Sequence, residues 1–377
     1  MPMIDTAASL SPLLRMALLG MLLASGPLLW LHLRQRGAAP TTRLRALTVL
    51  TLFLSFDLVM FGAFTRLTDS GLGCPDWPGC YGSASPVGAS QHIAAAQSAM
   101  PTGPVTHGKA WVEMIHRYVA SAVGVLILAL CVMTWRLSAV ARRGGQVLLI
   151  SPWWASATLV WVCVQGAFGA LTVTMKLFPA IVSLHLMGGV LLLMLLTVQA
   201  HAYEPKRLGL SPALHRATWL MLGLVLAQIA LGAWVSTNYA VLACDDFPTC
   251  QGQWWPAMDF EQGFTLWREL GVGSDGTWLS FAALTAIHLT HRLGAVVVLI
   301  GLVWLAYGLL ASRAADQRSW ALRLLALAAL QLLSGLSNAV LGWPLPAAIA
   351  HTGGAAALAV VLTLMLTRAG ESRKLFS

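Results

Sequence analysis

The chain has 377 residues, of which 58% are hydrophobic and only 10% are charged, and its formal net charge at pH 7 is +9. Soluble globular proteins carry about 25% charged residues, and disordered chains are poor in apolar residues. The composition therefore excludes an ordinary soluble enzyme and a disordered protein, and it predicts a chain that lies in a lipid bilayer.

Nine apolar runs are long enough to cross a membrane. The hydrocarbon core is about 30 Å thick and requires roughly 20 mostly apolar residues in a helix. In the first run the positive charges Arg34 and Arg36 follow the apolar stretch, which is the reverse of a signal peptide. We expect a retained helix with its N-terminus outside. The nine runs fall near 13–33, 46–65, 113–135, 149–171, 181–200, 216–236, 284–310, 320–342 and 346–367.

The positive charges predict the direction of the helices. If every run crosses the membrane, sixteen of the 23 Lys and Arg residues fall on one side, which the positive-inside rule makes the cytoplasm. No basic patch is interleaved with aromatic residues or confined to a soluble domain, so the charge does not indicate nucleic-acid binding. The sixteen are Arg34, Arg36, Arg43, Arg45, Arg136, Arg142, Arg143, Lys206, Arg207, Arg216, Arg313, Arg318, Arg323, Arg368, Arg373 and Lys374.

Two long loops, near 66–112 and 237–283, fall on the opposite side and hold four of the six cysteines. Cys74 and Cys80 are separated by five residues, as are Cys244 and Cys250. An oxidising compartment favours disulfides, so we interpret the pairs Cys74–Cys80 and Cys244–Cys250 as structural staples. For the first pair, thiol exchange with a redox partner stays open.

The core of the sequence is duplicated. GAFTRLTDSGLGCPDWPGCYG, from Gly62, resembles GAWVSTNYAVLACDDFPTCQG, from Gly232, at an offset of 170 residues. EMIHR resembles HLTHR at an offset of 175 residues. Two further pairs match at an offset of 166 residues: QGAFGAL resembles QLLSGLS, and SLHLMGG resembles AIAHTGG. Each copy has four spans, so both copies have the same orientation. Asp57, in the second run, has no acidic counterpart, and we assign it no role.

The expected fold is an all-α polytopic membrane protein. It consists of two tandem four-helix bundle repeats related by pseudo-two-fold symmetry, preceded by one extra transmembrane helix. The predicted parts are residues 1–45, an accessory helix with a cytoplasmic linker; 46–205, the N-terminal unit; and 206–377, the C-terminal unit.

Four histidines recur in the duplication at similar depths: His116 and His185 in the first unit, His291 and His351 in the second. Ionisable residues at such depth are rare and usually functional. Two imidazoles from neighbouring helices can ligate iron from both faces of a haem, and haem sites are commonly built in bundle interiors. A bare zinc or copper site would need three or four converging ligands, whereas each unit offers two. The alternative interpretation is four interfacial or hydrogen-bonded histidines.

Charged residues accompany one histidine of each pair. Arg117 and Arg292 directly follow His116 and His291, and an arginine fork suits a haem propionate. Interfacial snorkelling is the alternative for both arginines.

The repeat changes its chemistry at one position. Glu113 lies three residues before His116, on the same face of a helix, and its counterpart is His288. A carboxylate there can accept a proton or stabilise positive charge at a porphyrin rim. A salt bridge from Glu113 to Arg117 or Lys109 is the structural alternative. The asymmetry suggests one reactive pocket and one electron-carrying pocket.

Together TRLTDSGLGCPDWPGCYG, EMIHR, SLHLMGG, CDDFPTCQG, THRLGA and AHTGG resemble the bacterial haem A synthase family. The resemblance runs from about residue 46 onward, so the leading helix departs from the eight-span family core. It implies an enzyme that oxidises the C8 methyl of haem O to a formyl group, through a hydroxymethyl intermediate, with haem b (iron) as cofactor. It also implies that Glu113, His116 and His185 serve the substrate haem, and that His291 and His351 hold haem b.

The hypothesis that follows is that electrons are removed from the methyl carbon, water adds to the cation, and Glu113 takes the proton or stabilises the charge. The implied partners are the lipid bilayer, a haem O synthase and haem-copper terminal oxidase assembly. The implied location is the bacterial inner membrane, with the cysteine loops in the periplasm. The sequence leaves a homo-oligomer open.

Three other functions stay open. A di-haem b-type quinol or electron-transfer cytochrome explains both histidine pairs but gives no reason for a glutamate on one side. A membrane thiol-disulfide oxidoreductase leaves the four histidines unexplained. A haem chaperone or exporter would need only reversible binding.

Overall fold

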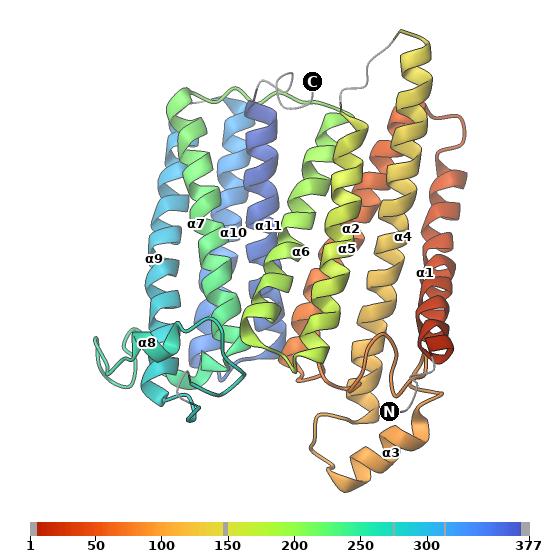
Figure 1. Cartoon of the computed structure of the whole chain (residues 1–377). Helices are drawn as coiled ribbons and strands as arrows, with labels where there is room; N and C mark the ends of the chain where they lie inside the picture. The colour runs from red at the N-terminus through yellow and green to blue at the C-terminus, as the bar shows by residue number, and fades with distance from the viewer. Residues whose placement is uncertain (1–5, 146–149, 274–275, 313, 371–377) are drawn as a thin grey trace. The chain divides into compact units, whose positions relative to one another are not determined.

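The computed structural model describes residues 6–145, 150–273, 276–312 and 314–370. Within these ranges every named element is a helix (Figure 1). Three of the sixteen basic residues used to predict the orientation, Arg313, Arg373 and Lys374, lie outside the described residues.

Nine helices of the described chain are long and apolar enough to cross a membrane, and each overlaps one predicted run. The fold is therefore an all-α polytopic membrane protein, as predicted. Short elements α3 (Ser90–Ala99), η1 (Ala240–Ala243) and α8 (Phe260–Gly263) lie in the two long loops. The long helices are α1 (Thr6–Arg34), α2 (Pro40–Leu67), α4 (His107–Arg143), α5 (Pro152–Thr174), α6 (Pro179–Ala202), α7 (Pro212–Thr237), α9 (Phe281–Ala311), α10 (Ala315–Val340) and α11 (Leu345–Ala369).

Capping residues set several helix starts. Ser151 and Ser211 accept hydrogen bonds from backbone amides of the first turn, with proline at the next position, where its missing N–H costs nothing. Thr106 caps α4 by accepting from the backbone N of Lys109 at 3.2 Å. This cap explains why α4 begins at His107, six residues before the predicted apolar run.

The helices form two compact units. Of the described residues, the first unit comprises those up to 177 and 202–204, and the second comprises those in 178–201 and 205–370. By this division α6 belongs to the second unit. The predicted domain boundary after residue 205 followed the sequence repeat rather than compactness, and it stays a prediction.

In the first unit α4 is the central helix, packed against α1, α2 and α5 (Figure 1). The approach of α1 is close, because a Cβ atom on Gly20 would lie 2.8 Å from the Cβ of Ser121. The loop between α2 and α4 covers the N-terminal end of α4, where Cys74, Cys80 and Ile93 are fully buried with Met114. We call the end of each unit that carries its disulfide-bonded loop the cysteine-loop end.

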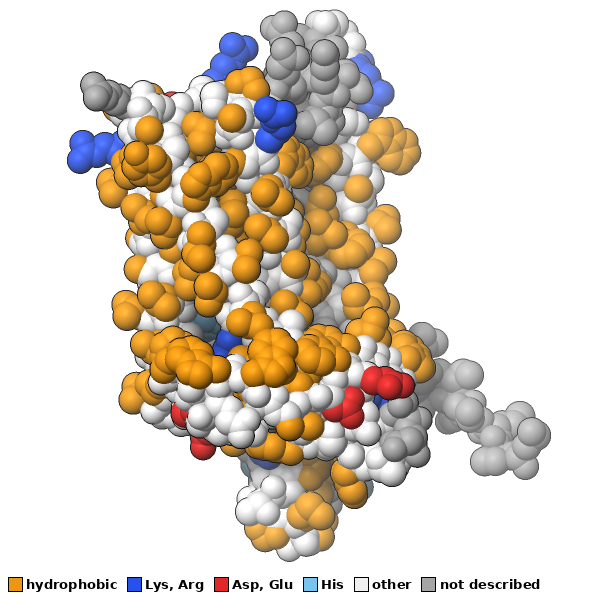
Figure 2. Space-filling view, turned by 90° about the vertical axis from the view of Figure 1, so that its left-hand side faces the viewer, with side chains coloured by type: hydrophobic (Ala, Val, Ile, Leu, Met, Phe, Trp, Pro, Cys, Tyr) orange, Lys and Arg blue, Asp and Glu red, His pale blue; other side chains and the backbone are white. Residues whose placement is uncertain are grey.

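In the second unit α7, α9, α10 and α11 form a closed four-helix bundle, each packed against the next. Its core is built from fully buried Leu302, Leu305 and Leu324 with Leu362. Val190 of α6 packs against this core. Outward-facing residues of α9 such as Ile300 and Trp304 are 65% and 61% exposed, and hydrophobic side chains cover this face (Figure 2). An apolar surface of this extent is what lipid contact requires.

Candidate functional site

Two histidines face each other inside the second unit. His291 lies on α9 and His351 on α11, with ring centroids 6.4 Å apart and ring planes inclined at 78°. A metal–imidazole nitrogen bond is about 2 Å long and the ring centre lies about 1 Å behind that nitrogen, so two imidazoles on opposite sides of one metal have centroids roughly 6 Å apart. The separation fits a single iron between the two rings.

Hydrogen bonds at Nδ1 orient both rings. The side-chain Nε2 of Gln228, on α7, lies 2.9 Å from Nδ1 of His291, and Oγ of Ser334, on α10, lies 3.0 Å from Nδ1 of His351. When one imidazole nitrogen donates its N–H to a protein acceptor, the lone pair of the other nitrogen is presented to the metal. The Ser334 hydroxyl donates its hydrogen to the carbonyl of Leu330 and can therefore accept from Nδ1–H of His351, which leaves Nε2 of His351 for iron. The amide nitrogen of Gln228 is a donor only, so its contact with Nδ1 of His291 does not by itself present Nε2 to a metal.

Glycines allow the helices to approach the rings. A Cβ on Gly232 would lie 3.0 Å from Cε1 of His291, and a Cβ on Gly335 would lie 3.1 Å from Cε1 of His351. In the first unit Gly62 has the same relation to Cε1 of His116, at 3.1 Å. The sequence offsets that relate Gly62 to Gly232 and His116 to His291 are therefore matched by the same local contact in each unit.

His116 lies on α4 and stacks on Phe61 of α2, with ring centroids 6.0 Å apart and ring planes 16° apart. Its predicted partner His185 lies on α6, which is part of the second compact unit. The pairing of His116 with His185 stays a prediction.

Glu113 is buried one helical turn from His116, with 4% of its surface exposed. Its Oε2 accepts a hydrogen bond from the backbone N of Cys74 at 2.8 Å, and its Oε1 forms an ion pair with Nη2 of Arg117. The salt bridge that the sequence left open as a structural alternative is therefore formed with Arg117. Lys109, the other suggested partner, instead donates to the carbonyl of Gly103 at 3.1 Å.

Arg117 and Arg292 hold the disulfide-bonded loops in the same way. Nη1 of Arg117 donates to the carbonyls of Asp76 at 3.0 Å and Gly79 at 2.6 Å. Nη1 of Arg292 donates to the carbonyls of Asp246 at 2.7 Å and Thr249 at 3.0 Å. The accepting residues are related by the offset of 170. These contacts anchor loop backbone, and the predicted contact of both arginines with haem propionates stays a prediction.

Both predicted disulfides are formed, Cys74–Cys80 and Cys244–Cys250. Each loop turns back after its second cysteine, where the backbone N of Cys80 donates to Ser83 at 2.7 Å and that of Cys250 donates to Gln253 at 2.9 Å. The two loops are local structural duplicates.

A carboxylate stabilises each turn. Asp76 accepts from the backbone N of Tyr81 and Gly82, and Asp246 accepts from the backbone N of Gln251 and Gly252. Asp246 also accepts from the hydroxyl of Thr249. The Thr249 hydrogen bond, followed by those of the two backbone amides, holds the pKa of the Asp246 carboxyl below its usual value.

The units differ where the sequence predicted asymmetry. His288 stands in place of Glu113, and its Nε2 accepts from Nε of Arg292 at 3.3 Å. Arg292 therefore donates to the ring of His288, whereas Arg117 pairs with the carboxylate of Glu113. Asp57 is exposed on α2, and no contact of the described residues gives it a role.

The sequence analysis missed the polar residues that contact the histidines, namely Gln228, Gln331 and Ser334. Nε2 of Gln331 donates to the backbone carbonyl of His351 at 2.9 Å, as Gln228 does to that of His291 at 2.8 Å. A signal was present, because Gln331 begins one of the repeated segments and each glutamine precedes by four residues a glycine that contacts a histidine.

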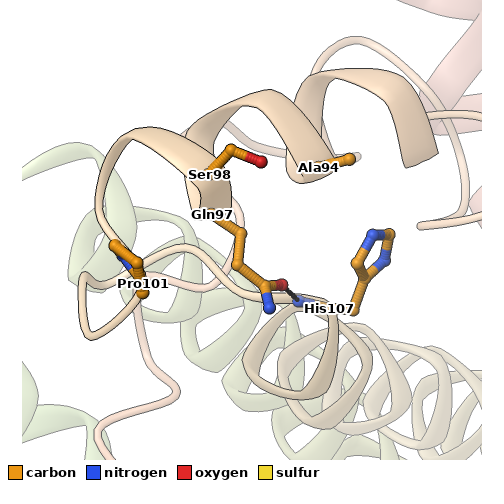
Figure 3. Close-up of a pocket in the computed structure, with 5 residues that line it drawn as sticks. All are labelled: Ala94, Gln97, Ser98, Pro101 and His107. Atoms are coloured by element: carbon orange, nitrogen blue, oxygen red, sulfur yellow. Dashed lines mark hydrogen bonds between the residues drawn. The ribbon is translucent and has the colours of Figure 1, made fainter.

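The described chain also has a hollow of about 330 Å³ between α3 and the start of α4 (Figure 3). It is lined by Ala94, Gln97, Ser98, Pro101 and His107, and Oε1 of Gln97 accepts from the backbone N of His107 at 3.0 Å. It includes none of the predicted site residues. Among the described residues no group of three His, Cys, Asp or Glu side chains is arranged to bind a metal ion.

Comparison with known proteins finds relatives that align over most of the chain. Heme A synthase of Shewanella oneidensis is 35% identical over 317 residues, which cover 83% of this chain and 92% of that protein. Heme A synthase of Allorhizobium ampelinum is 28% identical over 334 residues, covering 81% and 85% of the two chains. That of Methylobacterium radiotolerans is 28% identical over 340 residues, covering 84% and 86%. Residues 45–363 match the COX15-CtaA family, described as cytochrome oxidase assembly proteins. The chain belongs to this family.

Proposed function

We propose that this protein is a haem A synthase, a membrane oxidoreductase that converts haem O to haem A. The observation that carries the proposal is the pair His291 and His351, whose rings face each other at 6.4 Å in the second unit. Relatives named heme A synthase that align over most of the chain supply the reaction. In that reaction the C8 methyl of haem O becomes a formyl group through a hydroxymethyl intermediate.

The balance of the reaction defines what the protein must provide. Conversion of a methyl to a formyl group with oxygen from water releases four protons and four electrons. The site must therefore bind the substrate porphyrin, admit water to one methyl, receive protons and pass electrons onward. A resident haem b, when bound, supplies one-electron transfer.

His291 and His351 are the proposed ligands of haem b. The contact of the Ser334 hydroxyl with Nδ1 of His351 favours presentation of Nε2 of that ring, and Gly232 and Gly335 leave space beside the rings. Because both ligands come from helices of one closed bundle, the unit is suited to retain its cofactor.

His116 and His185 are the proposed ligands of the substrate haem. Gly62 gives His116 the same close approach that Gly232 gives His291, which supports an equivalent role. The predicted domain boundary between residues 205 and 206 is part of this proposal, because it assigns one haem to each repeat.

Glu113 is the proposed proton acceptor. A carboxylate has about four lone-pair sites, so its hydrogen bonds with Cys74 and Arg117 leave capacity for a further donor. Both contacts fix the carboxylate one turn from His116. The counterpart His288 has no negative charge to offer, which supports assigning the oxidation to the first unit.

The charge distribution supports a location in the bacterial inner membrane, with both disulfide-bonded loops in the periplasm. The proposed partners are a haem O synthase, which supplies the substrate, and the assembly of a haem-copper terminal oxidase, which uses the product. The family description as cytochrome oxidase assembly proteins supports the second partner.

The test is to express the chain with a haem O synthase in a host that lacks haem A, extract the haems and separate them by chromatography. We expect haem A and its hydroxymethyl precursor. If the protein is folded and haem-loaded yet neither compound forms, the enzyme function is wrong, and the di-haem electron-transfer cytochrome becomes the better explanation.

A further inference from the structure

Arg268, in the second long loop, is a buried cation without an ionic partner in the described chain. Only 4% of its surface is exposed. No carboxylate of the described residues lies within ion-pair distance of its guanidinium, whereas the buried Arg117 pairs with Glu113. Burial lowers the pKa of the Arg268 side chain, and no neighbouring charge of the described residues opposes this effect. A buried charge is costly unless an anion compensates it.

The hydrogen bonds of Arg268 use only part of its donor capacity. Nη2 donates to Oδ1 of Asn238 at 2.5 Å, and Nη1 makes a long contact of 3.4 Å with the carbonyl O of Val272. Nε is buried and has no acceptor among the described residues. An arginine offers five N–H donors in a planar fork, so Arg268 can still donate to a carboxylate.

The neighbours of Arg268 hold the guanidinium in place without neutralising it. Its central carbon lies 5.6 Å from the ring centroid of Trp234, a favourable cation–π arrangement. Trp234 donates from its indole nitrogen to the carbonyl O of Gly263 at 2.8 Å, and Nδ2 of Asn238 donates to the carbonyl O of Trp234 at 2.9 Å. None of these groups carries a negative charge. The cation is therefore fixed in position for an anion that the loop does not supply.

Arg268 lies on the side of α7 that faces away from His291. Gly232 of α7 approaches the His291 ring, and the two contacts of Arg268 on this helix, Trp234 and Asn238, follow Gly232 by two and six residues. Since an α-helix turns by about 100° per residue, both contacts point away from that ring. The guanidinium is therefore separated by α7 from the proposed haem b ligands.

The loop segment of Arg268 instead covers the start of α6, the helix of His185. The ring centroid of Trp267, the residue before Arg268, lies 4.7 Å from that of Phe178. The carbonyl of Phe178 accepts from the backbone N of Val182 and so begins the hydrogen bonding of α6. Phe178 precedes His185 by seven residues, which is about two helical turns. The segment therefore packs near the face of α6 that carries His185.

A second contact places the end of α7 beside the same part of α6. Oγ of Ser183 and Oγ1 of Thr237 are 3.2 Å apart. Thr237 directly precedes Asn238, which binds Arg268, and Ser183 precedes His185 by two residues, or about 3 Å along the helix axis. Both contacts put the arginine on the cysteine-loop side of His185.

We propose that Arg268 binds a propionate carboxylate of the substrate haem, the haem that we assign to His185. This inference rests on the proposed function. A porphyrin carries both propionates at one edge, and charged groups are costly in the middle of a membrane, so that edge belongs at the cysteine-loop end. An arginine fork matches a carboxylate in geometry and charge. The second long loop thus contributes to substrate recognition as well as to the closure of its own unit.

The test compares haem O with its dimethyl ester, in which both propionates are uncharged. The purified full-length protein carrying haem b is titrated with each porphyrin in detergent, and binding is followed by absorption difference spectra. We expect the unsubstituted chain to bind haem O more tightly than the ester. Arg268→Gln should weaken haem O binding about 10–100-fold, the contribution of a hydrogen bond between charged groups, and leave binding of the ester unchanged.

Two further variants make the comparison specific. Arg268→Lys keeps the positive charge but loses the planar fork, so it should weaken haem O binding by a smaller factor, and it serves if Arg268→Gln does not fold. Arg216→Gln is the matched control, because Arg216 is an exposed arginine at the opposite end of α7. It should leave both dissociation constants unchanged. The absorption spectrum of haem b should be the same in all of these proteins.

Equal weakening of haem O and ester binding by Arg268→Gln would show that Arg268 only supports the loop, and unchanged haem O binding would show that it holds no propionate. Either result would overturn the inference. A failure of the proposed function looks different. In that case the unsubstituted chain makes no haem A from haem O, whatever the Arg268 variants do to porphyrin binding.

Discussion

Arg117 forms a buried ion pair with Glu113, one helical turn before it on α4. The same guanidinium donates to carbonyls of the first disulfide-bonded loop, and the carboxylate accepts from the amide of Cys74 in that loop. The proposed proton acceptor and the loop are thus parts of one hydrogen-bonded network, which connects the histidine site to the cysteine-loop end.

Substitution of Glu113 should separate catalysis from cofactor binding. Glu113→Gln keeps an acceptor for the Cys74 amide but has no charge, so we expect haem b to remain bound while formyl production falls about 10²–10⁴-fold, the usual contribution of general acid–base catalysis. The measurement is chromatography of extracted haems alongside the reduced-minus-oxidised spectrum. Glu261→Gln, an acid of the second long loop, should behave like the unsubstituted chain. Normal haem A production by Glu113→Gln would remove Glu113 from the mechanism.

Substitution of the loop-anchoring arginines should loosen one loop at a time. Lysine keeps the charge of Arg292 but cannot reach the carbonyls of Cys244, Asp246 and Thr249 together. Since a hydrogen bond to a charged group contributes about 1.5–3 kcal/mol, Arg292→Lys should lower the local opening free energy of its loop by about 3 kcal/mol.

Hydrogen exchange of the loop peptides is the measurement for this prediction. Arg292→Lys should speed exchange in residues 244–254 and leave 74–84 unchanged, and Arg117→Lys should do the reverse. Equal exchange in both loops for both variants would show that the arginines do not anchor them.

Acid should release the turn that Asp246 stabilises. A carboxyl whose pKa is lowered in the folded state stabilises the fold above its unfolded pKa, and this contribution is lost as the pH falls through the folded value. Protonation of Asp246 at low pH should therefore speed amide exchange at Gln251 and Gly252 beyond the intrinsic pH effect. Asp246→Asn should show fast exchange already at neutral pH. If amide exchange at Gln251 and Gly252 stays slow both at low pH and in Asp246→Asn, then Asp246 does not stabilise this turn.

The sequence predicted the features that hydropathy and repetition control. All nine spans were predicted because each helix must be apolar along its whole length to cross a membrane. Both disulfides were predicted because each pair of cysteines lies close in sequence in a loop on the side expected to be oxidising. The carbonyl contacts of Arg117 were not predictable, since Gly79 lies 38 residues earlier and only the folded loop brings it to the guanidinium. The amide of Gln228 was missed for a similar reason, because it reaches His291 across 63 residues.

The helix starts show the same difference between what hydropathy predicts and what local polar contacts decide. Thr106 moved the start of α4 to His107 through a local cap, whereas the prediction followed the apolar run alone. The short helix α3 lies in the first long loop, where the sequence analysis predicted no helix. Local polar contacts, rather than burial in lipid, decide these boundaries.

Glycine substitutions should distinguish the two haem sites. A Cβ on Gly232 would lie 3.0 Å from His291, and one on Gly62 would lie 3.1 Å from His116, so each alanine must push its ring by a few tenths of an ångström. We expect Gly232→Ala to shift the absorption bands of haem b, and Gly62→Ala to reduce product formation while the haem b bands stay in place. Shifted haem b bands in Gly62→Ala would contradict the assignment of His116 to the substrate.

The most direct test of the central claim, one haem for each repeat, is the haem content of purified histidine variants expressed with a haem O synthase. The account predicts that His116→Ala retains haem b and lacks haem O and haem A, whereas His351→Ala loses haem b. His92→Ala, at a histidine that stacks on Tyr81 in the first long loop, should keep both haems. Loss of haem b from His116→Ala with retention by His351→Ala would contradict the account.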